Sequence, residues 1–388
     1  MVNRPAQNGF DVIVVGAGIV GLAHALAASR RGLSVAVVDR DHQAVGASIR
    51  NFGFITVTGQ REGRTWRRAL FSRDVWDQVM PKAGIPLVHR DLAVIARRPE
   101  AMQTLEGFAA GEMGVDCTLL DHDALYHRLP MTAPGAIGGL YSPHERRVEP
   151  RTAIPALAAW LEAERGVRFF RGVAVTGVES GAVDTTAGRI AGRHIVVCPG
   201  PDLVTLFPDQ LAAHKLRLCK LQMLRLAAPG WRLPAAVMGD LSLVRYEGYA
   251  AMPAAAALNE VLAAEAGDAL AHGIHLIIVQ SADGSLVVGD SHHYGATPDP
   301  FAPAEVEQII LREARKLLAP PEHLPVTERW TGLYPSSSEE TAFHDLVAPG
   351  VLLSQVSGGT GMSTGFALGE EGIAALLGET DPLEKTWN

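Results

Sequence analysis

A glycine-rich turn near the start of the chain has the residue types and spacing that suit a diphosphate. The turn reads GAGIVG and lies between the apolar run 10–15 and a segment with helical spacing. In such a turn the first glycine allows a tight bend, the second a close approach to the ligand, and the third close packing of helix on strand. The helix N-terminus then faces the anion. We expect six cofactor contacts here: Gly16, Ala17, Gly18, Ile19, Val20 and Gly21.

An acidic residue completes this dinucleotide pattern. Asp39 ends a second apolar run and stands 18 residues after Gly21. A carboxylate at this place accepts hydrogen bonds from the hydroxyls of the adenosine ribose, and its charge would repel the extra phosphate of NADP. We include the next residue, Arg40, among the cofactor contacts. The pattern by itself does not distinguish FAD from NAD, and its alternative is a glycine-rich turn without a ligand.

A second glycine-rich segment, SGGTGMS, occurs near the end of the chain between an apolar run and another helical segment. The N–H groups of a helix N-terminus there would stabilise the negative charge that a reduced flavin carries at its N1–C2=O edge. A structural turn without a ligand is the alternative. The expected cofactor contacts are Gly359, Thr360, Gly361, Met362 and Ser363.

The elements that must position these turns predict an α/β fold. Strand, turn, helix and strand follow one another over about 30 residues, which implies a parallel sheet. Apolar runs of this nucleotide-binding type return in the middle and at the end of the chain, which indicates a discontinuous domain. We expect a Rossmann-type FAD-binding domain from residues 1–84, 146–212 and 336–388, and an inserted α+β substrate domain with a mixed or antiparallel sheet from 85–145 and 213–335.

Periodicity also predicts individual elements. Strands are expected at 87–97, 243–246 and 274–280, helical pieces over 100–128, and a helix from Pro150 that ends at Gly166.

Composition narrows the class of protein. The chain has 388 residues, 47% hydrophobic, and a net charge of −8 without a basic stripe, which argues against nucleic acid as a partner. No apolar run reaches the roughly 18 residues of a membrane span, and the N-terminus lacks the pattern of a signal peptide. Three cysteines without metal-like spacing suggest reduced thiols, so we expect a cytoplasmic protein with no metal site.

Six segments together carry a family resemblance. They read GAGIVG with Asp39, ASIRNFG (47–53), GVAVTGVE (172–179), VVCPGP (196–201), RWTGLYP (329–335) and SGGTGMS (357–363). With these the chain resembles, over nearly its whole length, the D-amino-acid-oxidase-like flavoenzymes, the group that holds glycine oxidase, sarcosine oxidase and dimethylglycine dehydrogenase. The resemblance implies FAD, bound without a covalent link, and hydride transfer from a carbon that bears an amine. It adds as cofactor contacts Ser48, Arg50, Asn51, Phe52, Gly53, Val173, Val175, Cys198, Gly200 and Gly332.

On the substrate side the chain departs from the glycine oxidase pattern. Where those relatives place an arginine that holds the substrate carboxylate, this chain has Tyr334, and a phenol cannot form the two-pronged, charge-assisted pair. The pair Gly59-Gln60, the turn GDSHHYG and the segment GGTGM resemble instead a branch of the family associated with phosphonate breakdown. That branch implies oxidation of 2-aminoethylphosphonate or its N-methyl derivative, followed by imine hydrolysis to phosphonoacetaldehyde. Expected contacts to this small anionic amine are His292, His293, Tyr334, Arg245, Tyr246 and Arg329.

Three alternatives stay open at this point. The substrate can instead be glycine, sarcosine or a related amino acid. The chain can be a non-catalytic FAD- or NAD-binding protein. The electron acceptor can be oxygen or another molecule. No catalytic acid or base is named, because the flavin does the chemistry.

Overall fold

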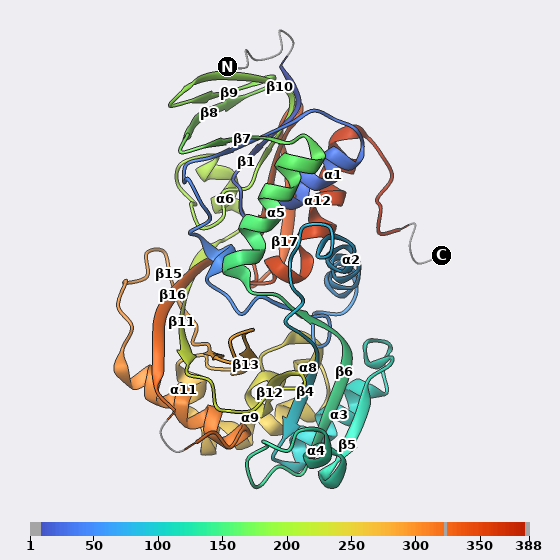
Figure 1. Cartoon of the computed structure of the whole chain (residues 1–388), viewed down its shortest axis with the longest axis vertical. Helices are drawn as coiled ribbons and strands as arrows, with labels where there is room; N and C mark the ends of the chain where they lie inside the picture. Colours follow the sequence, from blue (N-terminus) through green and yellow to red (C-terminus); the bar gives the residue numbers. More distant parts are fainter. Residues whose placement is uncertain (1–8, 322–323, 385–388) are drawn as a thin grey trace.

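The computed structural model describes residues 9–321 and 324–384, and within them the chain forms two sheets. Figure 1 shows the first sheet with β1, β7 and β10 at the end of the molecule near the N-terminus, and the second with β4, β6 and β11 at the other end. The two sheets differ in strand direction. The first is mostly parallel and the second mostly antiparallel.

The first sheet has the order β17-β18-β10-β1-β2-β7, to which the β8–β9 hairpin is attached. Its central strands are almost wholly apolar and buried, which suits a parallel sheet covered on both faces. Strands β18, β10, β1, β2 and β7 run parallel, and β17 runs antiparallel at one edge. The strands are β1 (Phe10–Val15), β2 (Val35–Asp39), β7 (Arg168–Arg171), β8 (Val175–Glu179), β9 (Ala182–Thr185), β10 (Gly188–Val197), β17 (Ala342–Ala348) and β18 (Val351–Val356).

Helices α1 (Ile19–Arg30) and α12 (Gly361–Leu377) pack closely against each other beside this sheet. The contact is tight because glycines of α12 face α1: a β-carbon on Gly369 would lie 2.5 Å from the backbone of Ala23. Helices α2 (Arg64–Val79) and α5 (Pro150–Arg165) pack against α12 and α1, and α5 ends at Gly166 in the left-handed conformation, as predicted. The short helix α6 (Pro208–Ala213) leads to the second sheet.

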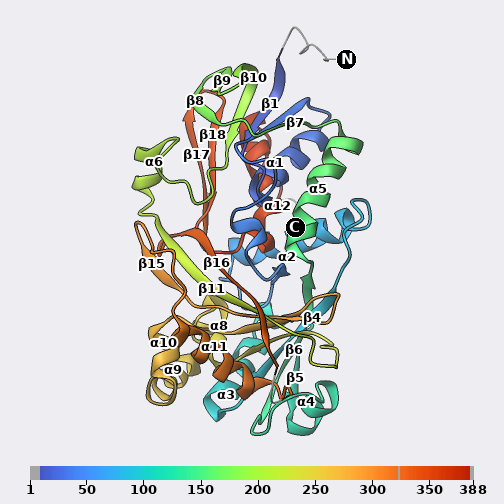
Figure 2. The same ribbon diagram turned by 60° about the vertical axis from the view of Figure 1, so that its left-hand side comes forward.

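The second sheet has the order β15-β11-β14-β13-β12-β4-β6-β3, with β16 paired to β11 and β5 to β6. Figure 2 shows the long strands β11 and β16 running side by side from the level of β15 down into this sheet. The strands are β3 (Phe54–Ile55), β4 (His89–Ala96), β5 (Thr118–Asp121), β6 (Gly138–Arg147), β11 (Arg217–Leu226), β12 (Ala236–Gly239), β13 (Ile277–Gln280), β14 (Leu286–Gly289), β15 (His293–Gly295) and β16 (Val326–Ser336).

The helices around the second sheet bury its apolar core. None of the helices in the described part of the chain is long and apolar enough to cross a membrane. The helices around the second sheet are α3 (Pro99–Ala109), α4 (His122–Arg128), α7 (Asp240–Leu243), α8 (Glu247–Ala250), α9 (Ala254–Glu265), α10 (Gly267–Ala271) and α11 (Ala304–Leu317). The chain also has 3-10 turns at Ala47–Ile49 and Glu112–Gly114.

The predicted fold class is confirmed, but several elements differ from expectation. Residues 243–246 are not a strand, because the N–H groups of Arg245 and Tyr246 donate to the carbonyl of Ser242 in a turn after α7. The helical region 100–128 contains strand β5 between α3 and α4, and the strand expected at 274–280 begins only at Ile277. The sequence analysis missed β3, β6, β12, β15, β16 and β17. The domain division stays a prediction: the second sheet also takes β3 from within 1–84, and β6 and β16 run just past residues 145 and 335.

Candidate active site

A cavity of about 500 Å³ lies where the two sheets meet. Cys198, just beyond β10, and Ser354 of β18 contribute to its wall from the first sheet, and Leu221 of β11 and Ile277 of β13 from the second. The N-termini of α1 and α12 also open onto it, so the partial positive charge of two helix ends faces the same space.

The early glycine turn forms one side of this cavity. Gly18, Ile19, Val20 and Gly21 line it, whereas Gly16 and Ala17 do not. The turn is tight: Gly16 has a φ of 102°, and a β-carbon on Gly21 would lie 1.9 Å from the carbonyl oxygen of Gly16. The residue types of the motif are therefore required by backbone packing as well as by any ligand.

Asp39 lies behind the turn and not in the cavity wall. Its carboxylate accepts hydrogen bonds from the N–H of Ala17 at 2.6 Å and of Asp41 at 2.8 Å, so it fixes the start of the turn. Val173 is adjacent, since its N–H donates to the carbonyl of Asp39 at 3.0 Å. Besides Gly16 and Ala17, four further predicted cofactor contacts at this end lie outside the cavity wall: Asp39, Arg40, Val173 and Val175. Their predicted contacts to adenine and ribose stay predictions.

Residues 47–53 close the cavity beside α1. The hydroxyl of Ser48 accepts the N–H of Ile19 at 2.9 Å, which joins this loop to the helix N-terminus. Asn51 holds the loop itself, because its amide donates to the carbonyl of Ala47 and accepts from the N–H of Gly53 at 2.8 and 2.7 Å. Ser48, Arg50, Asn51 and Phe52 line the cavity, and Gly53 lies behind them.

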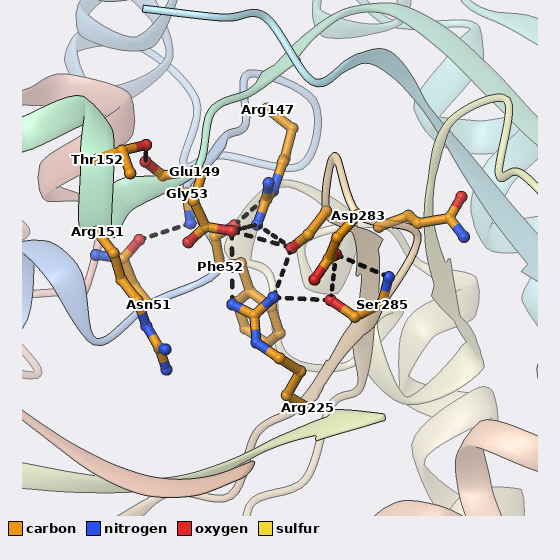
Figure 3. A network of polar contacts seen from close by, with 12 residues as sticks. Asn51, Phe52, Gly53, Arg147, Glu149, Arg151, Thr152, Arg225, Asp283 and Ser285 are labelled. Carbon is orange, nitrogen blue, oxygen red and sulfur yellow. Dashed lines mark hydrogen bonds and ion pairs between the residues drawn. The ribbon is translucent and has the colours of Figure 1, made fainter. Parts of the chain in front are cut away.

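A polar network anchors this loop from the second sheet (Figure 3). The Arg147 guanidinium, which is 1% exposed, donates to the carbonyl of Phe52 at 3.1 Å and to the Glu149 carboxylate at 3.0 Å. Arg225 adds a second positive charge 3.5 Å from the same carboxylate. Burial raises the pKa of Glu149, but the two guanidiniums more than offset it, and the pKa is lowered overall. Glu149 is therefore ionised at neutral pH and ties β6 and β11 to the cavity wall.

The late glycine turn forms a part of the cavity wall next to the early turn. Gly359, Thr360, Gly361, Met362 and Ser363 all line it, together with Cys198, Gly200 and Gly332. The turn contacts the early one directly, since a β-carbon on Gly361 would lie 3.3 Å from a methyl group of Ile19. Two segments that are distant in the sequence thus border one space. Burial raises the pKa of the Cys198 thiol, which argues against a nucleophilic cysteine here.

The predicted substrate contacts divide into two groups. Arg245, Tyr246, His292 and Tyr334 line the cavity. Burial raises the pKa of both phenols, so they stay neutral hydrogen-bonding groups, and it lowers the pKa of His292 to about 3, so this imidazole is neutral. The guanidinium of Arg245 donates to the hydroxyl of Tyr294, which also lines the cavity.

His293 and Arg329 lie elsewhere. Nε2 of His293 is 3.0 Å from Nδ1 of His272. Side chains alternate between the two faces where β15 begins, so His292 and Tyr294 face the cavity and His293 faces away. Arg329 forms an ion pair with Glu307, and its side chain is 52% exposed. Neither residue lines the cavity, so direct contact with a substrate held there is not expected of them.

Several polar residues of the cavity wall were not predicted as contacts from sequence, among them Gln60, Arg217, His275 and Asp290. Asp290 could have been predicted from sequence, because it stands two residues before His292 in the turn GDSHHYG. His275 had no such signal, since it lies between two elements with no motif around it.

Comparison with known proteins gives the family. Residues 11–375 match the family described as FAD dependent oxidoreductase. The chain belongs to this family. The match confirms the predicted cofactor, FAD, and the predicted class of enzyme, an oxidoreductase.

Individual relatives are more distant. The bifunctional protein ThiO/ThiG of Nostoc sp. is 26% identical over 85% of this chain but only 47% of its own length, so the chain spans about half of that relative. Glycine oxidase from Geobacillus kaustophilus has a similar fold, with a TM-score of 0.77, 19% identity and 96% of each chain covered. L-proline dehydrogenase from P. horikoshii also has a TM-score of 0.77, at 16% identity, over 98% of this chain and 96% of its own.

The residues present fit FAD. Glycines stand where β-carbons would collide with the backbone of the early turn, and the space beside Gly200 is open, with no atom within 4 Å of where its β-carbon would lie. Two helix N-termini supply N–H groups for negative charge, one suited to the diphosphate and one to the flavin. Ser48, Asn51 and Thr360 would add polar contacts from the cavity wall.

Proposed function

We propose that this FAD-dependent oxidoreductase oxidises the C–N bond of a small amine that also carries an anionic group. The first candidate is 2-aminoethylphosphonate or its N-methyl derivative. Bound FAD supplies the acceptor for the hydride that leaves the carbon next to nitrogen. The resulting imine is hydrolysed by water to phosphonoacetaldehyde, with release of ammonia or methylamine.

The observation that carries this proposal is the side-chain set around Arg245. Its guanidinium lines the cavity and donates to the hydroxyl of Tyr294, and Tyr334 and Arg217 line the same cavity. Two guanidinium groups and two phenol groups can donate hydrogen bonds to the three oxygens of a tetrahedral phosphonate dianion.

The protein groups have distinct tasks in this proposal. Arg245, Tyr294 and Tyr334 would bind the anionic group and so fix the distance of the carbon atom from the flavin. The ring of Tyr334 packs against Gly359, with its Cζ 3.0 Å from where a β-carbon would lie, so a substrate held by the phenol is close to the late turn.

A second candidate is glycine, sarcosine or a related amino acid. It is favoured by the similarity in fold to glycine oxidases from Geobacillus kaustophilus and Bacillus cereus. A carboxylate can also bind Arg245, so geometry alone does not separate the two substrate classes.

A panel of amines mixed with the protein under anaerobic conditions tests the proposal. We expect the flavin absorbance to bleach with 2-aminoethylphosphonate or N-methyl-2-aminoethylphosphonate and not with glycine or sarcosine. Bleaching with glycine or sarcosine alone would establish the second candidate, and the anaerobic format makes the result independent of the electron acceptor.

A further inference from the structure

A buried group of three metal-ligand side chains lies in the wall of the cavity. His275, Asp290 and His292 are 6%, 4% and 7% exposed, and all three line the cavity. One ligand atom from each lies within 4.8 Å of the other two. Two imidazoles and a carboxylate are a donor set that binds zinc and other divalent transition metals.

The distances between the ligand atoms suit a central ion. Nε2 of His275 is 3.0 Å from Oδ1 of Asp290, and Nε2 of His292 is 3.8 Å from Oδ2. A tetrahedral Zn²⁺ with bonds of about 2.0–2.1 Å separates its ligand atoms by about 3.3 Å, a value between these two distances. The Nε2 atom of His275 and the Oδ1 atom of Asp290 are in contact, but they do not form a well-aligned hydrogen bond.

The tautomer of His292 also suits a metal ligand. Its Nδ1 lies 2.8 Å from the carbonyl oxygen of Gly273, and since a carbonyl only accepts, Nδ1 carries the proton. The lone pair is therefore on Nε2, which faces the Asp290 carboxylate. A histidine that binds metal usually donates its other N–H to a carbonyl or carboxylate in this way.

The backbone holds the three residues together before any ion binds. The N–H of His292 donates to the carbonyl of His272 at 2.9 Å, which fixes the segment 290–292 against 272–275. The close approach requires a glycine at position 273, where φ is 61° and a β-carbon would lie 2.9 Å from that of His292.

We propose that His275, Asp290 and His292 form a binding site for one divalent transition metal ion of the zinc class. Because all three residues line the cavity, the ion would keep a coordination position open to water or to an anionic oxygen. The Arg245 guanidinium lines the same cavity and donates to Tyr294, and an anion bound between the ion and this guanidinium would neutralise both. The proposal goes beyond the sequence analysis, which expects no metal, and it does not depend on which amine is the substrate.

Titration of the FAD-loaded protein with ZnCl₂ alone, after dialysis against a chelator, tests this site. We expect one Zn²⁺ per chain by calorimetry, and at least about 100-fold weaker binding in His292→Ala and Asp290→Asn. The matched control is His293→Ala, the neighbouring residue that points away, and it should change the affinity less than about threefold. Flavin absorbance and circular dichroism check that each variant is folded.

X-ray absorption at the zinc edge supplies a test that needs no variant. The wild-type protein with one equivalent of Zn²⁺ should show two imidazole rings and oxygen ligands at about 2.0–2.1 Å. The proposal is overturned if no stoichiometric Zn²⁺ binds, if His293→Ala abolishes binding while His292→Ala does not, or if the spectrum shows a different number of imidazoles.

Discussion

The α-carbon of Gly21 lies so close to the carbonyl oxygen of Gly16 that a β-carbon at position 21 would be 1.9 Å from it. This contact makes helix α1 start directly at the cavity, where the N–H groups of its first turn would face the diphosphate of bound FAD. The residues of the motif thus satisfy the packing of strand and helix and the binding of an anion with one geometry.

The first prediction concerns this contact. Gly21→Ala should lose bound FAD, because the new β-carbon would collide with the carbonyl oxygen of Gly16 and force the turn to move. Ordinary overpacking costs about 1–3 kcal/mol, and this collision is more severe. The ratio of flavin to protein absorbance in the purified variant measures it. Gly267→Ala is the matched control, since a β-carbon there meets no atom within 4 Å, and it should keep a full equivalent of FAD.

A second prediction concerns the network below the cofactor loop. Arg147→Met leaves the Glu149 carboxylate with one charged partner less in a mostly buried site, so the free energy of unfolding should fall by about 3–5 kcal/mol. Urea denaturation followed by circular dichroism measures the change. Arg189→Met is the control: its partners Glu179 and Asp184 are more than half exposed, and the change should stay below about 1 kcal/mol. An equal effect of both variants would contradict the structural role given to Arg147.

A third prediction concerns acid stability. Burial, helped by the charge of Arg147, lowers the pKa of His89 from 6.5 to about 4. Between about pH 6.5 and pH 4, His89 is therefore protonated in the unfolded chain but not in the folded protein. The stabilisation is complete above pH 6.5 and is lost progressively as the pH falls toward 4.

His89→Gln should make this loss shallower by up to about 1.4 kcal/mol per pH unit. Glutamine can still accept the N–H of Gln280, which donates to Nε2 of His89 at 3.2 Å, so the variant should fold. Urea midpoints at several pH values give the slope. The exposed His122 serves as control, and His122→Gln should leave the slope unchanged; a slope that does not change in His89→Gln would refute the prediction.

A fourth prediction separates the two arginines that sequence alone treated alike. Arg245→Met should lower kcat/KM for the anionic amine about 10- to 100-fold, the value of one charged hydrogen bond, mostly through KM. Arg329→Met should leave kcat/KM within about twofold, because Arg329 pairs with Glu307 outside the cavity. If the Arg329 variant were the impaired one, the substrate would bind elsewhere.

Local sequence predicted the parts of the site that depend on local geometry. The early and late glycine turns each lie between a buried strand and a helix, and this pattern is visible in a single stretch of sequence. Tyr334 and His292 were also proposed, through resemblance, as residues near the substrate, and both line the cavity.

The missed residues depend on contacts between distant segments. Pairing of β13 with β14 places Ile277 opposite Gly289, and this register brings His275, just before β13, to Asp290, just after β14. No periodicity within either segment indicates that meeting. The expected strand at 243–246 failed for a local reason, because the carbonyl of Ser242 accepts the N–H groups of Arg245 and Tyr246 and turns the chain there.

An anaerobic single turnover of the FAD-loaded protein with N-methyl-2-aminoethylphosphonate tests the central claim most directly. The account predicts complete bleaching of the flavin, with one equivalent each of phosphonoacetaldehyde and methylamine per flavin. A flavin that keeps its oxidised spectrum with this amine and with 2-aminoethylphosphonate, yet bleaches with glycine or sarcosine, would contradict it.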